Sequence, residues 1–157
     1  MRIHNLLNRD RVAVGIDASS KEGVIDQIID LLADDSAITD IESVRSAVIE
    51  RENAMSTGVG KGIALPHGKS QGVTTTVAAL ATTARPIPFG AVDGQPVQMI
   101  FLLVGTPESK SEHIRILSRI SRLLSRETFT QELLKATSPD MLLETLTREE
   151  LNLSSLN

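Results

Sequence analysis

The chain has 157 residues, 41% of them apolar and 23% charged, a composition typical of one globular domain with a buried core. A formal net charge of −4, with 2% aromatic residues and no Trp or Tyr, excludes a general attraction to nucleic acid and base-stacking platforms. Cysteine is absent, which excludes disulfides, thiol nucleophiles and thiolate metal sites. No signal-peptide core and no run of about 20 apolar residues is found, so we expect a cytoplasmic protein without stable membrane insertion.

The first third of the chain predicts one strand and two helices. Residues 12–16 alternate as a short strand would. Ser19 and Glu22 have the spacing of a capping box, and the apolar residues that follow at helical intervals predict a helix ending near Asp34. A similar pattern predicts a second helix over 41–53, directly before a glycine-rich loop.

The middle of the chain predicts the centre of a sheet. Residues 74–82 are rich in β-branched side chains, and 97–104 (VQMIFLLV), apolar except for Gln98, predict a strand buried on both faces. The tight-turn dipeptide at 93–94 predicts that 87–92 is an edge strand, paired as a hairpin with the segment that starts at 97. We expect the prolines at 86, 88 and 96 to limit this pairing.

The last third predicts three helices. A long helix is expected over 109–124 and a shorter one over 127–135, and Ser138 and Pro139 supply the start of a third that runs through Leu146. The apolar face of the long helix is predicted to consist of Ile114, Leu117, Ile120 and Leu124. Its arginines are interpreted as a solvated face, with contact to an acidic partner as the alternative: Arg115, Arg119, Arg122 and Arg126.

These elements predict one α/β domain over residues 1–157, with a core at about 3–148 and a short tail at 149–157. Helices occur before, between and after the strands. This order predicts a central mixed, mostly parallel sheet flanked by helices on both faces.

The segment 56–69, STGVGKGIALPHGK, is the candidate functional site. Proline before His67 and glycine after it give this imidazole a backbone of defined geometry at the end of a short strand. Four glycines and several flanking donors in the same segment favour a reactive histidine over a structural one. His4, near a terminus that we expect to fray, is interpreted as structural.

Several kinds of chemistry are excluded by missing motifs. No HExxH sequence or cysteine pair indicates zinc, and no GxSxG sequence indicates a serine hydrolase. The Walker pattern fails because Met55 stands where its first glycine belongs and Gly62 stands where Ser or Thr is required. The remaining chemistry is an imidazole nucleophile that accepts a phosphoryl group, a reaction that mainly requires positioning and hydrogen-bond donors.

The segment from Glu52 to Gly68, which contains Val59-Gly60 and Ile63-Ala64-Leu65-Pro66-His67-Gly68, resembles the phosphorylation-site signature of the enzyme IIA proteins of the bacterial phosphotransferase system, fructose/mannitol type. The resemblance continues through residues 93–97, the strand that ends at Val104, and Glu112-His113. It therefore covers most of the chain.

The resemblance implies that His67 accepts phosphate from the phosphocarrier HPr or an HPr-like protein and passes it on. Arg51 and His113 match an arginine and a second histidine that lie beside the acceptor in the family. Ser56, Thr57 and Gly68 are weaker candidates for phosphate contacts. No metal, nucleotide or other cofactor is implied, and the second nitrogen of His67 is expected to be held by a backbone carbonyl.

Three functions remain open on the sequence. The first is a phosphocarrier of the nitrogen-regulatory subgroup, because no fused transporter or HPr-like segment is present, and its partner is then a regulatory target protein. The second is a sugar-transport component that passes phosphate to an enzyme IIB. The third is a protein-binding module that is not phosphorylated, which the presence of His67, Arg51 and His113 disfavours.

Overall fold

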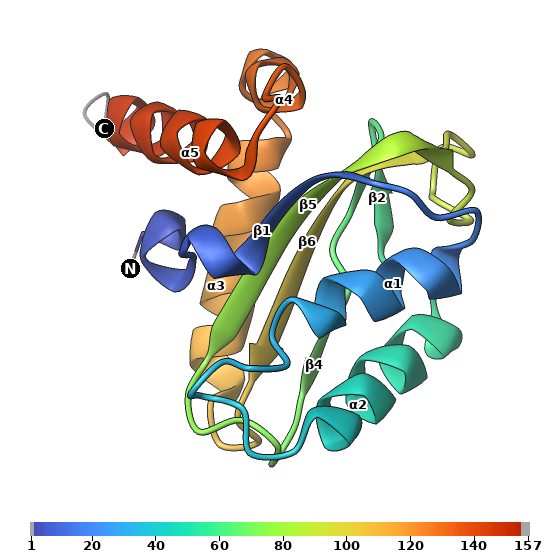
Figure 1. The fold of residues 1–157 in the computed structure, drawn as a ribbon, viewed down its shortest axis with the longest axis vertical. Helices are drawn as coiled ribbons and strands as arrows, with labels where there is room; N and C mark the ends of the chain where they lie inside the picture. Colours follow the sequence, from blue (N-terminus) through green and yellow to red (C-terminus); the bar gives the residue numbers. More distant parts are fainter. Residues whose placement is uncertain (1, 155–157) are drawn as a thin grey trace.

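A six-stranded sheet forms the centre of the structure, a computed structural model that describes residues 2–154. Five of its strands lie in the order β1 (Val12–Ile16), β5 (Val77–Ile87), β6 (Val97–Gly105), β3 (Ile63–Ala64) and β2 (Gly58–Gly60). The sixth, β4 (His67–Lys69), continues beyond β3 along the same edge of β6 (Figure 1).

The pairing of these strands is mixed, as predicted. β1 runs parallel to β5, and both β3 and β4 run parallel to β6. The central pair β5 and β6 is antiparallel, as is the short hairpin of β2 and β3. β4 pairs with the last residues of β6, and His67 lies opposite Leu103. The candidate histidine is therefore near the carboxyl ends of two neighbouring parallel strands.

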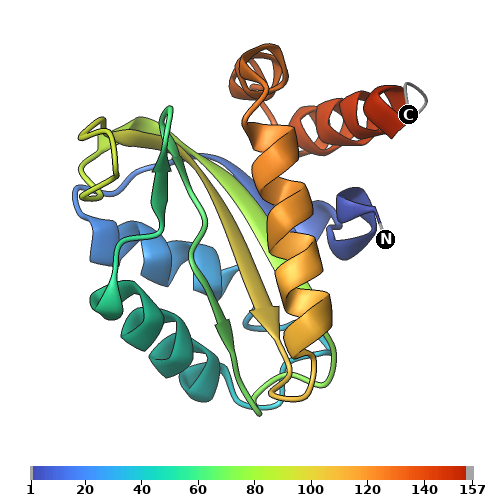
Figure 2. The same ribbon diagram turned by 180° about the vertical axis from the view of Figure 1, so that it is seen from behind.

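Helices cover both faces of the sheet, which confirms the predicted fold class. α1 (Lys21–Asp30) and α2 (Ile41–Ala54) lie on one face, as Figure 1 shows. The other face carries α3 (Lys110–Leu124), and α4 (Glu127–Leu134) and α5 (Pro139–Ser154) follow it at one end (Figure 2). Two 3-10 helices, η1 (Ile3–Leu6) and η2 (Arg9–Arg11), precede β1.

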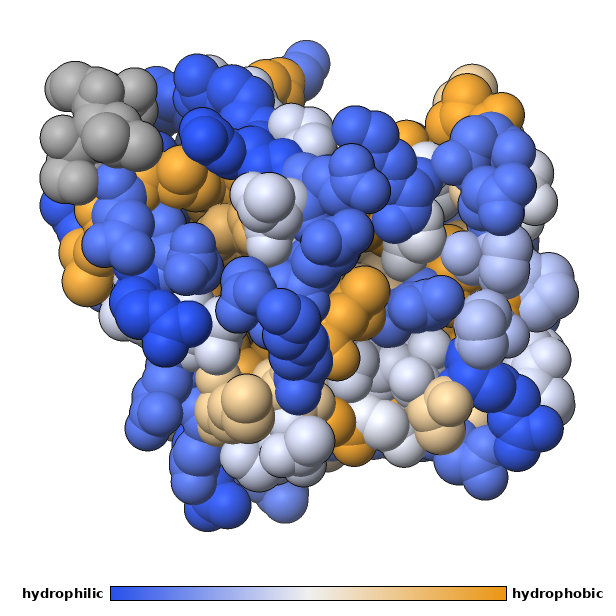
Figure 3. Space-filling view, turned by 90° about the horizontal axis from the view of Figure 1, so that it is seen from above, coloured by the Kyte–Doolittle hydropathy of each residue, from blue (hydrophilic) through white to orange (hydrophobic). Residues whose placement is uncertain are grey.

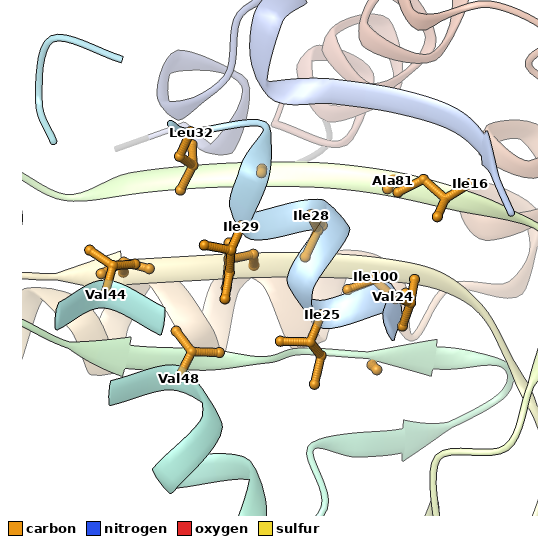
Figure 4. Packing of buried hydrophobic residues seen from close by; sticks show 14 of the residues in the cluster. Ile16, Val24, Ile25, Ile28, Ile29, Leu32, Val44, Val48, Ala81 and Ile100 are labelled. Carbon is orange, nitrogen blue, oxygen red and sulfur yellow. The ribbon is translucent and has the colours of Figure 1, made fainter. Parts of the chain in front are cut away.

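Each face of the sheet has its own apolar core. On one face the buried side chains of α1 and α2 point toward β5 and β6 (Figure 4), among them Val24, Ile25, Ile28, Ile29, Val44 and Val48. On the other face the sheet, η1 and the last three helices share a second core, which includes Ile3, Leu6, Ile116, Ile120, Phe129, Leu133, Leu142 and Leu146. Burial of this much apolar surface fixes the sheet on which the site is built.

The predicted strands differ from the observed ones around the prolines. β5 begins at Val77 instead of 74 and continues to Ile87, so the separate edge strand predicted at 87–92 is wrong. The hairpin is formed by β5 itself, and Ile87 pairs with Val97. The ladder is irregular between Thr82 and Ile87, which lets Pro86 lie in the strand without a backbone N–H.

The helices also correct the sequence expectations. α1 ends at Asp30 instead of near Asp34, and a turn follows. In α3 it is Ile116 that is buried, whereas Ile114 is 57% exposed, so the predicted apolar face was rotated. α5 continues to Ser154 instead of ending at Leu146, which makes most of the expected tail helical. No helix within residues 2–154 is long and apolar enough to cross a membrane.

The first residues are fixed to α5 instead of frayed. The buried carboxylate of Glu150 accepts hydrogen bonds from the backbone N–H groups of Ile3, at 2.7 Å, and His4, at 2.9 Å. Nδ1 of His4 lies 2.7 Å from the same carboxylate, and Nε of Arg119 lies 3.0 Å from it. His4 is therefore a structural residue, as the sequence indicated, but for a reason that the sequence did not provide.

Candidate functional site

The site is built around His67, the first residue of β4. Its Nδ1 lies 2.8 Å from the carbonyl oxygen of Leu65. Because a carbonyl oxygen can only accept, Nδ1 must carry the proton, and this leaves Nε2 of the neutral ring with a free lone pair. Leu65 thus supplies the backbone carbonyl that was expected for this histidine.

His113 lies next to His67. It comes from the first turn of α3, and the two ring centroids are 5.6 Å apart with an angle of 52° between the ring planes. His113 is buried, and neither of its ring nitrogens has a hydrogen-bond partner among the described residues. Burial, together with the positive charges that His67 and Lys69 can carry, lowers the pKa of His113 to about 4, so its ring is neutral near pH 7.

Positive side chains also surround His67. Burial lowers the pKa of His67 below its usual 6.5, and the nearby charges of Arg51 and Lys69 lower it further. The hydrogen bond to Leu65 and the charge of Glu52 act in the opposite direction. The net result is an imidazole that stays unprotonated, and therefore nucleophilic, to lower pH than a free histidine does.

Arg51 comes from the last turn of α2. Its Nη1 donates a hydrogen bond to the carbonyl oxygen of Met55, at 2.8 Å, beyond the end of the helix. Its charge also acts on His67 and lowers the pKa of that imidazole, while its guanidinium is engaged with the backbone. Its other N–H groups leave capacity for an anionic ligand.

The weaker candidates Ser56 and Thr57 both use their hydroxyl groups within the loop. Ser56 donates to the carbonyl oxygen of Phe89 at 2.7 Å, and Thr57 donates to the carboxylate of Glu52. A phosphate contact from either hydroxyl proton would require these bonds to be exchanged. Both residues hold the loop in the observed structure.

Gly68 has a packing role that its neighbours explain. A Cβ atom at this position would lie 3.2 Å from the carbonyl carbon of Ala47 and 3.3 Å from the nitrogen of Val48, both in the backbone of α2. A side chain here would press against that backbone, so glycine permits the close approach of β4 to the helix. The third weak candidate therefore places His67 against α2.

The glycine-rich loop is a hairpin and not an irregular loop. β2 and β3 are joined at Lys61 and Gly62, which both have positive φ, at 58° and 79°. The backbone N–H of Lys61 donates to the carboxylate of Asp93 at 2.9 Å, which ties the hairpin to the turn between β5 and β6. The hairpin thus gives the segment before His67 a fixed course.

A hollow of about 440 Å³ lies at the tip of this hairpin, away from His67, and its walls come from the hairpin, the start of β6 and α4. Figure 3 views this end of the molecule, where hydrophilic surface separates the hydrophobic residues into small areas.

Among the described residues, no group of three or more His, Asp or Glu side chains is placed to hold a metal ion.

Sequence reasoning missed two residues that support the site. Glu52 was noted only as the acidic residue of a signature, and Lys21 was not noted. Nζ of Lys21 lies 2.9 Å from Oε1 of Glu52, whose side chain is 2% exposed. The sequence offered a weak signal, because the cation Lys21 at the start of α1 and the anion Glu52 near the end of α2 are each disfavoured by the dipole of their own helix.

The fold and the site together define an α/β protein with a reactive histidine at the edge of its sheet. One ring nitrogen of this histidine is hydrogen-bonded to the backbone, and the other has a free lone pair. Comparison with known families is more specific. Residues 5–149 match the model of the family described as "Phosphoenolpyruvate-dependent sugar phosphotransferase system, EIIA 2". The chain belongs to this family.

Relatives of two kinds are similar to the chain. A fructose-specific EIIA component from Haloferax volcanii is 36% identical over 76% of the chain and 78% of its own length. A nitrogen regulatory protein from Pseudomonas aeruginosa is 30% identical over 90% of the chain and 92% of its own length. A fructose-specific EIIABC component from Bacillus subtilis is 31% identical over 96% of the chain, which spans only 24% of that relative.

Solved structures agree with this assignment. The nitrogen regulatory protein IIA-Ntr from Neisseria meningitidis has a TM-score of 0.84 at 28% identity and covers 92% of the chain and 98% of its own. A mannitol enzyme IIA from Escherichia coli, solved in complex with phosphorylated enzyme IIB, has a TM-score of 0.76 at 23% identity, with 90% of this chain and 96% of that chain covered. The second likeness concerns the fold alone.

Proposed function

We propose that the protein is a phosphocarrier that accepts a phosphoryl group on Nε2 of His67 from HPr or an HPr-like carrier. The observation that carries this proposal is the hydrogen bond from Nδ1 of His67 to the carbonyl oxygen of Leu65, at 2.8 Å. It fixes the ring in the tautomer whose free lone pair is on Nε2.

The transfer is balanced without a metal or a nucleotide. The bond between phosphorus and the donor's phosphohistidine nitrogen breaks as the bond from phosphorus to Nε2 of His67 forms. The donor ring leaves with the electron pair of the broken bond, and Nδ1 of His67 keeps its proton throughout. Both sides are phosphohistidines of similar energy, so the step is reversible.

The neighbours of His67 supply what the transferring group needs. Its charge is spread over three equatorial oxygens, which are stabilised by positioned donors and cations. His113 is neutral and buried with both nitrogens unpartnered, so its N–H can donate to a phosphoryl oxygen without first losing another bond. Arg51 and Lys69 add positive charge near His67.

A regulatory role is the first candidate for the use that the cell makes of the phosphorylated protein. The chain covers 92% of the nitrogen regulatory protein from P. aeruginosa, so nearly all of that relative is represented. In this role the phosphorylation state of His67 controls contact with a target protein. The same charge change would be the signal whatever the target is.

A sugar-transport role is the second candidate. The similarity to fructose-specific components supports it, and the fold is that of an enzyme IIA solved in complex with enzyme IIB. In this role phosphate passes from His67 to an enzyme IIB. A binding module that is never phosphorylated is the third reading, and the paired histidines disfavour it.

Labelling with phosphate tests the proposal. Incubation with phosphoenolpyruvate, enzyme I and HPr-type carriers should give one acid-labile phosphate per chain, and His67→Ala should abolish it. His4→Ala is the matched control, because His4 lies against Glu150 instead of in the site, and it should be labelled as the parent is. Label that survives His67→Ala would sink the assignment. Transfer of the label to a purified enzyme IIB would favour the transport role over the regulatory one.

A further inference from the structure

Two charged side chains stand at helix ends where the helix dipole disfavours them. Lys21 is the first residue of α1, where a cation meets the positive end of the dipole. Glu52 is in the last turn of α2, where an anion meets the negative end. Each is stabilised by the other, since Nζ of Lys21 and Oε1 of Glu52 are 2.9 Å apart.

Glu52 directs both of its carboxylate oxygens at the loop before His67. Oε1 accepts a hydrogen bond from the backbone N–H of Thr57 at 3.0 Å, and Oε2 accepts one from the Thr57 hydroxyl. Thr57 and Glu52 are 5% and 3% exposed, so water competes little for these bonds. The carboxylate therefore sets both the position of the Thr57 backbone and the rotamer of its side chain.

The same connection continues to the imidazole. The carbonyl oxygen of Thr57 accepts from the backbone N–H of Leu65 at 3.0 Å. The carbonyl oxygen of Leu65 in turn accepts from Nδ1 of His67 at 2.8 Å. An unbroken series of hydrogen bonds and one ion pair thus leads from α1, through the end of α2, to the ring nitrogen that fixes the tautomer.

Lys21 is also connected to the loop before His67 through Phe89. Its ammonium lies 5.3 Å from the ring centroid of Phe89, a cation–π distance. The carbonyl oxygen of Phe89 accepts from the Ser56 hydroxyl at 2.7 Å. Both loop residues that follow Met55 are therefore held by groups that Lys21 contacts.

Stability alone is a poor reason for this arrangement. A buried ion pair loses much of its Coulombic gain to desolvation, and a well-packed apolar pair often stabilises a fold as well. A buried carboxylate also makes directional hydrogen bonds to the loop, which an apolar pair cannot make, and such bonds fix the position of the loop. The geometry favours positioning as its purpose.

We propose that Lys21 and Glu52 are positioning residues, which hold the Leu65 carbonyl in place through Thr57 and so keep His67 in the tautomer with Nε2 free. This inference rests on the proposed function of His67 as phosphoryl acceptor. Its structural part, the control of the tautomer, applies to the unphosphorylated protein.

The test is the ¹⁵N chemical shifts of the imidazole nitrogens of His67, which report the tautomer, measured beside the rate of phosphoryl acceptance. Glu52→Gln replaces an acceptor oxygen with an amide nitrogen and removes the negative charge that pairs with Lys21. We expect the proton of His67 to become shared between its two nitrogens, and acceptance to slow by about tenfold as alignment of the nucleophile is lost.

A matched control separates positioning from stability. Glu150→Gln also neutralises a fully buried carboxylate that accepts backbone N–H groups, but it lies on α5. It should lower the free energy of unfolding. The ¹⁵N shifts of His67 should match those of the parent, and the acceptance rate should stay within about twofold of it. Lys21→Met, with the exposed Lys135→Met as its control, should change the His67 shifts in the same direction as Glu52→Gln does.

The outcomes are distinct. If Glu52→Gln does not fold, Thr57→Val removes the hydroxyl at nearly constant shape and gives the same readout. Parental His67 shifts in the folded variants overturn the proposal, whatever their rates. If His67 is never phosphorylated, the proposed function fails, and the shifts still decide whether Lys21 and Glu52 control the tautomer.

Discussion

Replacing Glu150 with glutamine tests the contact that joins the two ends of the chain. Oε2 of this carboxylate accepts from the backbone N–H of Ile3 and from Arg119, and Oε1 accepts from the backbone N–H and ring of His4. Glutamine keeps the shape and one oxygen. Its amide nitrogen must then face two of the donors that the carboxylate had satisfied.

The expected loss follows from these contacts. A buried donor left without an acceptor costs about 1–3 kcal/mol, and two such donors are affected. Arg119 and His4 are 30% and 17% exposed, so water can partly satisfy them, and the lower end of the range applies. We expect the free energy of unfolding to fall by about 2 kcal/mol, which lowers Tm by roughly 4–8 °C in a chain of this length.

The pH dependence gives a second, independent signature. Burial raises the pKa of Glu150, but hydrogen bonds from His4, Ile3 and Arg119 outweigh it, and the pKa lies below the usual 4.5. A carboxyl group with a depressed pKa stabilises the folded state above its unfolded pKa, and this contribution is lost as the pH falls through the folded pKa. The stability difference between parent and variant should therefore narrow below pH 4.5.

Urea denaturation at pH 7 and at a series of lower pH values measures both effects, with circular dichroism as the probe. A loss below about 1 kcal/mol at pH 7 would mean that the N-terminal residues are held by apolar packing and not by the carboxylate. A difference that stays constant as the pH falls would refute the charge-based part of the argument.

Three further predictions concern the site. Arg51→Lys should slow phosphoryl acceptance by about tenfold, because lysine lacks the planar fork of donors, and stability should change by less than about 0.5 kcal/mol; equal rates would refute its role. Gly105→Ala would place a Cβ atom 2.8 Å from the hydroxyl of Ser109 and 2.9 Å from Nδ1 of His113, so it should displace both side chains and slow acceptance, as rate measurements and ring NMR shifts can check; a parental rate with unshifted ring signals would contradict this. Because the pKa of His67 is lowered, acceptance should persist below pH 6.5 and stability should fall on acidification there, since the unfolded chain binds the proton more tightly; an NMR titration midpoint at or above 6.5 would contradict this.

The fold class could be predicted because strands buried on both faces have a clear apolar pattern in the sequence. The run at 97–104 is apolar except for the exposed Gln98, because β6 is the strand between β5 and the edge strands and is covered on both faces. The face of α3 was harder to predict, since sets spaced three or four apart fit both Ile114 and Ile116. Contact with η1 and the sheet decides between them, and sequence spacing alone does not contain that contact.

Proline misled the strand boundaries for a physical reason. Pro86 was expected to limit the pairing of a separate edge strand at 87–92, because proline cannot donate to a ladder. The register between Thr82 and Ile87 is irregular, so no donor is required at that position and the strand continues. Such an irregularity depends on the partner strand and leaves no local pattern.

The sequence indicated the candidate residues around His67, but it did not indicate the side chains that hold the loop before His67 in place. His67, Arg51 and His113 belong to a recognisable family pattern, and the structure brings the two histidines together. Glu52 and Lys21 meet across 31 residues, and their pairing is visible only once α1 and α2 lie side by side. Their charges, each at the unfavourable end of a helix, were the available sign that a partner existed.

The contact between Ile3 and Glu150 also has a consequence for the order in which the molecule assembles. It joins residues 147 positions apart, so forming it early would carry a large loop-closure cost, whereas the pairing of β5 with β6 closes a short turn. Closure of the ends is thus expected after the sheet has formed, and it is also a contact that can open while the sheet stays intact. The loop before His67 is held by nearer contacts on the other face, to Glu52 and Phe89, so the chain can release its ends while this loop keeps its position.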